Sequence, residues 1–200
     1  MKPWMHDKEI ELVIKYIENA HDKIMLEYGS GGSTLLFSKY VKTYYSIEHN
    51  LDWYYEVRKK LVDGDRNNVI QYLNDYPKGR AEIYLNFYDK WSDLINQISV
   101  EKSNNYHGIM DYINPKEMYI WYDYVNSIDK FKQVKYDFIF IDGRSRVNCA
   151  QKVLNYIDKN SLIFIHDFFP RQEYQSMFKY YEEVDSVKDT EQTIVVLKKK

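Results

Sequence analysis

The stretch "MLEYGSGGSTLLFSKY", residues 25–40, contains the feature that decides the fold. A short apolar run ends at Gly29, Gly31 and Gly32 follow almost at once, and an amphipathic segment begins at Ser33. A strand, a glycine-rich turn and a helix in this order are typical of a parallel α/β sheet at its ligand-binding edge, since glycine lets a ligand approach the backbone. We therefore interpret residues 23–29 as a buried strand and residues 33–41 as a helix.

Apolar runs and helical patterns alternate along most of the chain. Further strands are predicted at 43–50, 67–74, 136–142 and 161–168, and helices at 6–19, 51–64, 116–131, 146–160 and 171–183. The tail from Val184 predicts two strands joined by a short turn. The pattern predicts a doubly wound α/β fold, with a mainly parallel sheet of seven strands, helices on both faces and a C-terminal antiparallel hairpin. We expect one domain over residues 1–200, with a variable insertion at about 75–115.

The composition excludes several classes of protein. The formal net charge is −2 over 200 residues, which argues against binding nucleic acid through bulk charge. The single cysteine, Cys149, excludes an intramolecular disulfide framework and a cysteine-rich zinc site. The chain shows no apolar run of signal-peptide or membrane-spanning length. We expect a soluble, cytoplasmic protein with a small-molecule partner and no membrane partner, and the oligomeric state stays open.

Two common glycine loops fit the sequence poorly. A P-loop needs a lysine before its Ser or Thr, and the loop at 29–34 has none. The dinucleotide fingerprint requires a third glycine at position 34, where Thr34 stands. The loop therefore argues against a P-loop and weakens the case for a dinucleotide site.

The pattern Glu27-x-Gly29-x-Gly31-x-Ser33-Thr34, followed by Glu48 at the end of the second strand, resembles class I S-adenosylmethionine (SAM)-dependent methyltransferases. Their sheet also ends in an antiparallel hairpin. The resemblance implies that Gly29 and Gly31 lie against the methionine part of SAM, within a cofactor loop that includes Ser33 and Thr34. Glu27 would order this loop or meet the cofactor's amino group. Glu48 would accept hydrogen bonds from both ribose hydroxyls.

Two later strand ends carry dense polar groups. Asp142, Arg144 and Arg146 follow the strand "FIFI", and His166 and Asp167 end the strand "LIFI". The pattern I-D-G-R-x-R-x-x-C-A with a later I-H-D-F resembles a group of small methyltransferase-like domains. The resemblance implies that these segments form the acceptor side of the site, at the sheet edge that carries the glycine loop.

The chemistry of methyl transfer assigns candidate roles to these side chains. A hydroxyl acceptor usually needs a group that takes its proton, and either Asp142 or His166 is suited to that. Asp142 could instead hold the methionine end of the cofactor, and His166 could be a structural histidine. Arg144 and Arg146 could clamp a phosphate or carboxylate of the acceptor, although for one of them we expect a salt bridge with Asp142 or Asp167 instead.

A metal and the overall function remain open at this level. Catechol-type methyltransferases hold magnesium with acids at these two strand ends, which Asp142 and Asp167 could imitate. The histidine and phenylalanine around Asp167 depart from that motif, so a divalent metal is not favoured. The sequence predicts a SAM-dependent enzyme that O-methylates a small polar acceptor, such as a sugar or nucleotide sugar. The alternatives are a Rossmann oxidoreductase that binds NAD or a nucleotide sugar, and a non-catalytic binding module.

Overall fold

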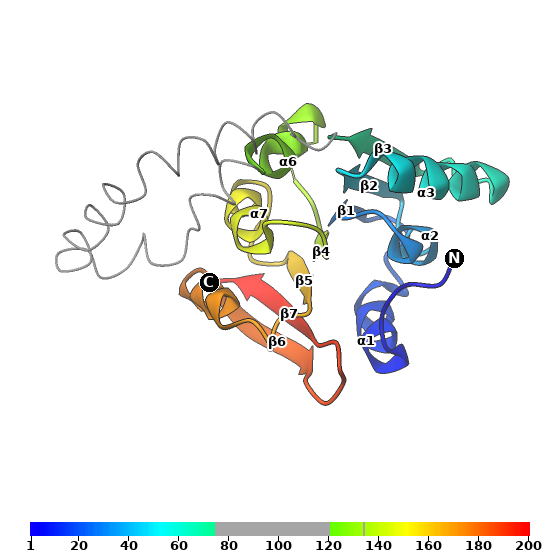
Figure 1. Cartoon of the computed structure of the whole chain (residues 1–200). Coiled ribbons are helices and arrows are strands. Elements are labelled where there is room, and N and C mark those ends of the chain that lie inside the picture. Colours follow the sequence, from blue (N-terminus) through cyan, green and yellow to red (C-terminus); the bar gives the residue numbers. More distant parts are fainter. Residues whose placement is uncertain (75–120, 134) are drawn as a thin grey trace, which may run out of the picture.

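The computed structural model describes residues 1–74, 121–133 and 135–200 (Figure 1). The insertion expected at about 75–115 lies outside these residues, as does the start of the helix expected at 116–131. That part of the domain prediction therefore stays a prediction.

The described residues form a seven-stranded sheet in the order β3-β2-β1-β4-β5-β7-β6. The strands are β1 (Ile24–Tyr28), β2 (Thr43–Glu48), β3 (Val69–Leu73), β4 (Phe138–Ile141), β5 (Leu162–His166), β6 (Tyr181–Val187) and β7 (Ile194–Lys199). β7 runs antiparallel to both β5 and β6, and the pairs among β1 to β5 are parallel. This confirms the mainly parallel sheet with its closing antiparallel hairpin.

The strand order places the candidate site beside β1 and β4. The chain leaves the edge strand β3 and re-enters the sheet next to β1, so the direction of winding reverses between β1 and β4. Tyr28 is in register with Ile141, and the amide of Asp142 donates to the Tyr28 carbonyl at 3.0 Å. Gly29 and Asp142 therefore follow neighbouring strands at the switch point, where ligands bind in open α/β sheets.

Helices cover both faces of this sheet, as the apolar patterns predicted. The α-helices are α1 (Asp7–Ile17), α2 (Gly32–Phe37), α3 (Leu51–Asp63), α6 (Tyr122–Val125) and α7 (Arg146–Lys152), and the 3-10 helices are η1 (Asn126–Lys130), η2 (Val153–Asn155) and η3 (Gln172–Lys179). Ile139 and Ile141 pack into a core cluster with residues of α6, α7 and η3. Phe138 and Phe140 point to the opposite face, into a cluster with α1 and α2. The period-two alternation of β4 thus fills both cores.

Several helix predictions extend too far. The helix expected at 33–41 ends at Phe37, and the described part of the helix expected at 116–131 is α-helical only over Tyr122–Val125 before the 3-10 helix η1. The helix expected at 171–183 is the 3-10 helix η3, and β6 already begins at Tyr181, whose hydroxyl is buried and donates to the Ala150 carbonyl at 2.6 Å. The helix expected at 146–160 stops being α-helical at Lys152, and the Tyr156 carbonyl accepts the amide of Tyr136. The helices expected at 146–160 and 171–183 thus end earlier than the apolar spacing predicts, and at each end a tertiary hydrogen bond stabilises the non-helical backbone.

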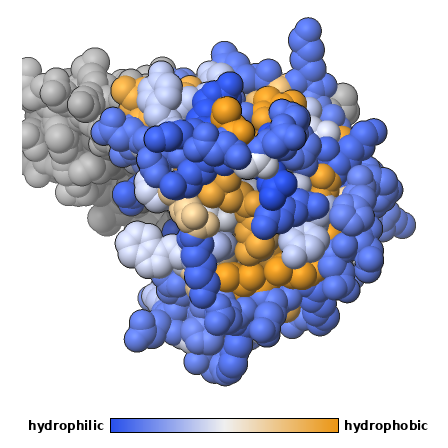
Figure 2. All heavy atoms as spheres, turned by 90° about the vertical axis from the view of Figure 1, so that its right-hand side faces the viewer, coloured by the Kyte–Doolittle hydropathy of each residue, from blue (hydrophilic) through white to orange (hydrophobic). Residues whose placement is uncertain are grey.

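The outer surface beside α1 and α2 carries both hydrophobic and hydrophilic residues. Figure 2 shows hydrophobic residues gathered in the middle of this face and hydrophilic residues around them. The cluster beneath α1 and α2 is extended by partly buried side chains such as Ile10 and Leu36. Within the described ranges, we find no helix with the length and apolarity needed to cross a membrane.

Candidate active site

Gly29 can only be glycine in this fold. Its φ of +98° is a backbone conformation that L side chains rarely adopt, and a Cβ at this position would meet the Cα and N of Gly143 at 2.8 Å. The turn after β1 therefore touches the turn after β4 backbone to backbone. This contact fixes the glycine loop against the segment that carries Asp142.

A buried carboxyl group organises the glycine loop from below. Glu27 is fully buried on β1, where it accepts hydrogen bonds from the hydroxyls of Ser33 and Thr34 at 2.5 Å and of Ser46 at 2.9 Å. Thr34 Oγ1 in turn accepts the amide of Gly31 at 2.8 Å. Burial raises the pKa of Glu27 to about 8, against the lowering effect of the three hydroxyls. Of the two roles expected for Glu27, these contacts correspond to ordering the loop.

Glu48 is held by backbone amides at the end of β2. Its Oε2 accepts the amide of Ser30 at 2.9 Å, and its Oε1 accepts the amides of His49 and Asn50, each at 2.8 Å. A carboxylate offers about four lone-pair sites. Three are used in these contacts, which leaves one acceptor site on Oε2. The expected contact of Glu48 with the ribose hydroxyls stays a prediction.

Gly31 differs from Gly29 because no protein atom requires it to be glycine. Its φ is −178°, which any residue adopts, and a Cβ there would approach only Ser33 Oγ at 3.7 Å and Trp53 Nε1 at 4.0 Å. Adding a methyl group would therefore cost the fold little. The space above Gly31 is part of an open cavity.

This cavity has a volume of about 1190 Å³ and unites the predicted segments. Its wall includes the N-terminal residues 1–4, the glycine loop, the start of α3 and the ends of β4 and β5. Nine of the predicted site residues line it, and these are Gly29, Gly31, Ser33, Glu48, Asp142, Arg144, Arg146, His166 and Asp167. Glu27 and Thr34 do not line it and lie in the layer beneath the loop.

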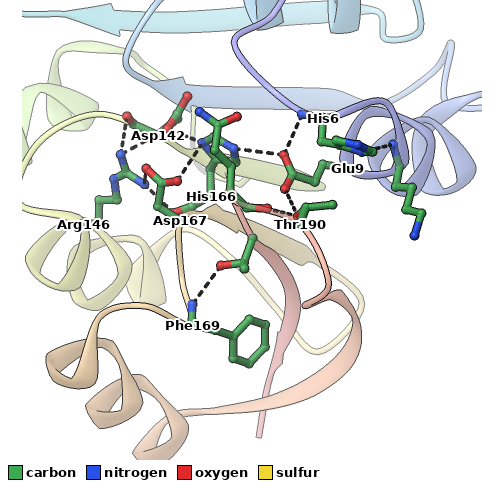
Figure 3. A network of polar contacts seen from close by, with 11 residues as sticks. His6, Glu9, Asp142, Arg146, His166, Asp167, Phe169 and Thr190 are labelled. Atoms are coloured by element: carbon green, nitrogen blue, oxygen red, sulfur yellow. Dashed lines mark hydrogen bonds and ion pairs between the residues drawn. The ribbon is translucent and has the colours of Figure 1, made fainter.

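His166 lies between two carboxyl groups, on the side of the cavity formed by the ends of β4 and β5 (Figure 3). Its Nδ1 is 2.9 Å from Asp142 Oδ1, and its Nε2 is 3.2 Å from Glu9 Oε2. The side chains of His166 and Glu9 are almost fully buried, whereas that of Asp142 is 26% exposed and reaches the cavity. Burial lowers the pKa of His166, but its hydrogen bond to Asp142 and the charges of Asp142, Asp167 and Glu9 outweigh burial and raise it.

The two arginines of this segment have different surroundings. Arg146 lies among the strand ends, where its Nε donates to the Gly143 carbonyl at 3.0 Å and its Nη2 to the Asp142 carbonyl at 3.1 Å. Its guanidinium also donates to the His166 carbonyl and lies 3.2 and 3.4 Å from carboxylate oxygens of Asp142 and Asp167. These are the salt bridges expected for one of the two arginines.

Arg144, by contrast, is exposed and lines the cavity. Its guanidinium makes no hydrogen bond or ion pair with residues 1–74, 121–133 or 135–200. Within the described ranges, Arg144 is therefore an unpaired cation beside the cavity.

The acids at this end do not form a ready metal site. Asp142, His166 and Asp167 offer ligand atoms within 4.8 Å of one another. However, the guanidinium of Arg146 lies 3.2 and 3.4 Å from oxygens of both carboxylates, and His166 Nδ1 is hydrogen-bonded to Asp142. A divalent ion held by all three groups would have to displace the hydrogen bond between His166 Nδ1 and Asp142, so the arrangement disfavours a metal site.

Several residues of the site carried no signal in the sequence. Glu9 belongs to α1, where it accepts the amide of His6 at 3.0 Å, so its pattern is that of an ordinary helix-capping residue. Its contact with His166 joins residues 157 positions apart. Trp53 of α3 donates to the Ser30 carbonyl at 2.6 Å, and residues 1–4 pack so closely that a Cβ on Gly32 would meet Lys2 at 2.3 Å.

Comparisons with known proteins agree on the fold. No family model and no curated protein matches the chain. A methyltransferase-like protein from Silicibacter pomeroyi DSS-3 is 18% identical with a TM-score of 0.63, and the match covers 98% of this chain and 88% of that one. The chain has the fold of class I methyltransferases. A candidate methyltransferase from Streptococcus mutans, solved in complex with SAH, is 11% identical with a TM-score of 0.59, covering 98% of this chain and all of that one.

Further structures extend the range of this class I methyltransferase fold. An rRNA methylase from Streptococcus thermophilus is 9% identical with a TM-score of 0.60, and the match covers 98% of both chains. The chain spans only 59% of the length of another match, a point mutant of MtNAS, at 10% identity and a TM-score of 0.58. Because one fold hosts many functions, the identity of the acceptor must be argued from the site.

Proposed function

We propose that the protein transfers a methyl group from SAM to a hydroxyl group of a small, anionic acceptor, such as a sugar acid or a nucleotide sugar. The observation that carries this proposal is the cavity that joins the glycine loop, Glu48 and the groups around Asp142. When bound, SAM supplies a methyl group on a sulfonium, which is open to in-line attack. The chain supplies the rest, namely binding, orientation and a proton acceptor.

The charge of the cavity beside the glycine loop supports SAM over NAD. On the side formed by the end of β2 and the start of α3, the cavity-lining residues include three acids and no lysine or arginine, and the acids are Glu48, Asp52 and Glu56. SAM carries a sulfonium and an ammonium beside one carboxylate, so it is attracted by such a wall. The pyrophosphate of NAD is repelled by it. This charge balance counts against the oxidoreductase alternative.

The space above Gly31 supports a ligand close to the loop backbone. Gly31 is glycine although neither φ nor packing requires it, and it lines the cavity. A ligand that lies on the backbone explains this choice. The methionine part of SAM is the portion that the resemblance places there, with one ribose hydroxyl on the remaining acceptor site of Glu48.

Arg144 supports the proposed class of acceptor. Its guanidinium lines the cavity and is neutralised by no described residue, whereas Arg146 is paired with two acids and Lys2 with Asp7. Guanidinium groups bind carboxylates and phosphates through paired hydrogen bonds. An acceptor with such a group would be held with its hydroxyl towards Asp142. The small net charge of the chain favours such an acceptor over nucleic acid.

A methyl-transfer assay tests the proposal. Labelled SAM is incubated with nucleotide sugars, sugar acids and neutral sugars, with and without magnesium. We expect transfer to anionic acceptors without a magnesium requirement. Arg144→Ala should raise the KM for the anionic acceptor roughly 10- to 100-fold and leave SAM affinity unchanged. Arg171→Ala, an exposed arginine outside the cavity wall, is the matched control. Transfer only to neutral acceptors, or equal behaviour of the two variants, would contradict the assignment of Arg144.

A further inference from the structure

The contacts of His166 exclude it as the proton acceptor, which is one of the two roles that the sequence left open. Its two ring nitrogens each face a carboxyl oxygen, at 2.9 Å from Asp142 and 3.2 Å from Glu9. A neutral imidazole has one N–H, so its other nitrogen would point a lone pair at a carboxylate. The imidazolium form donates to both. In that form, with both nitrogens engaged and the side chain 2% exposed, His166 has no lone pair to accept a proton from an acceptor.

Asp142 has the accessibility that His166 lacks. Its Oδ1 faces His166 and Arg146, and its side chain is 26% exposed at the cavity wall. No hydrogen bond joins its Oδ2 to another described residue. This leaves one carboxylate oxygen free to accept the proton of a hydroxyl group in the cavity.

Glu9 is the buried carboxyl group that meets the second ring nitrogen of His166. It is completely buried on α1, and its Oε1 is fixed by the hydroxyl of Thr190 at 2.6 Å while its Oε2 accepts from His166 and from the His6 amide. A buried carboxylate needs a charged or donating partner, and the imidazolium provides both. Asp167, 4.0 Å from His166 Nδ1, and Arg146 are the other charged groups facing this pair.

We propose that Glu9 is a positioning residue that holds His166 as an imidazolium, and that His166 in turn orients Asp142 as the proton acceptor for methyl transfer. The proposal rests on the proposed function for its second half. In the step itself, the acceptor oxygen forms a bond to the methyl carbon and the carbon–sulfur bond breaks with its electron pair going to sulfur. The hydroxyl proton passes to Asp142 Oδ2, and the products are the methyl ether and the neutral thioether of the cofactor.

The test is the protonation state of the His166 ring, read by nitrogen-15 NMR at neutral pH. In the wild-type protein we expect both ring nitrogens to be protonated. In Glu9→Gln, which removes the charge but keeps the side-chain length, we expect the His166 signal of a neutral ring with the proton on Nδ1. Thr190→Val is the matched control, because it removes the hydroxyl that donates to Oε1 of Glu9 and leaves the carboxylate on His166. It should keep the imidazolium signal.

Turnover tests the second half of the proposal. Glu9→Gln should lower kcat about 10- to 100-fold, by analogy with the loss seen when a residue that orients a metal ligand is replaced, with SAM affinity changed less than about twofold. A neutral His166 in the wild-type protein overturns the inference whether or not Glu9→Gln folds. An unchanged His166 signal and unchanged kcat in a folded Glu9→Gln protein also overturn it. Failure of the wild-type protein to transfer methyl would instead refute the proposed function, while the NMR result would still judge the pairing of Glu9 and His166.

Discussion

The buried carboxyl of Glu27 makes the stability of the loop depend on pH. The pKa of Glu27 is raised to about 8 by burial, so the folded protein holds a proton there that the unfolded chain releases near the ordinary pKa of 4.5. In this range the folded state binds more protons than the unfolded state. The stabilisation that Glu27 contributes is therefore fully present below the unfolded-state pKa. It is lost as pH rises towards the folded-state pKa.

Replacing Glu27 with glutamine tests this dependence. Glu27→Gln keeps a polar group for Ser33, Thr34 and Ser46 and cannot ionise. Relative to this variant, the wild-type protein should lose roughly 2 kcal/mol of unfolding free energy between about pH 6 and pH 8. Denaturant unfolding across this range gives the measurement. Parallel curves for the two proteins would show that Glu27 is ionised in the folded state and would contradict the assignment.

At this scale, local sequence predicts the residues of the glycine loop and misses their distant partners. The motif at Glu27, Gly29 and Gly31 lies within five residues, so its pattern is visible in one stretch. Glu9 meets His166 only because α1 packs beside the end of β5. The spacing of apolar residues in the sequence does not predict a polar contact between two such distant residues. The roles of Glu9 and of Arg146 could be assigned only once the side-chain geometry was known.

At the scale of elements, the turn between β1 and α2 contains two glycines with different surroundings. The fold constrains Gly29, and we expect the cofactor to constrain Gly31. Gly29 has φ +98° and backbone contact with Gly143, whereas Gly31 has extended backbone and open space. Gly29→Ala should destabilise the protein by about 2 kcal/mol or more. Gly31→Ala should change stability by less than about 0.5 kcal/mol.

Gly31→Ala, which should have little effect on stability, should have a large effect on the affinity for SAM. A methyl group on Gly31 occupies space in the cavity, so Gly31→Ala should weaken SAM binding about 5- to 100-fold, the cost of overfilling a packed contact. Thermal unfolding and calorimetric titration of each variant give both quantities. Full SAM affinity in Gly31→Ala would mean that the cofactor does not lie on this part of the loop.

Strands were easier to predict than helices for a physical reason. A buried strand such as β4 is an unbroken apolar run, and its ends fell within about two residues of those expected, the usual uncertainty. Residues 180–183, "YYEE", fit either a helix or an edge strand. Cross-strand contacts decide between them, including the ion pair of Glu182 with Lys198 at 2.9 Å.

For the whole molecule, the alternation of strands and helices predicts the α/β class but not the order of the strands. The two strands predicted in the tail, and the resemblance to class I methyltransferases, both predict a closing antiparallel hairpin, and the sheet has it. The order matters for function because it brings β1, β4 and β5 side by side. Residues 27–34, 142–146 and 166–167, distant in sequence, meet through this topology. The side-chain pairs formed there depend on packing that no pattern in the sequence specifies.

The central claim is that this cavity binds SAM. Calorimetric titration of the purified protein with SAM, with SAH and with NAD in parallel tests it most directly. We predict that SAM and SAH bind and release or absorb heat with a single site per chain, and that NAD gives no signal. Binding of NAD without SAM would contradict the account of the glycine loop and of the acidic wall beside it. Silence from all three ligands would contradict the claim of a SAM site and favour a binding module of the same fold.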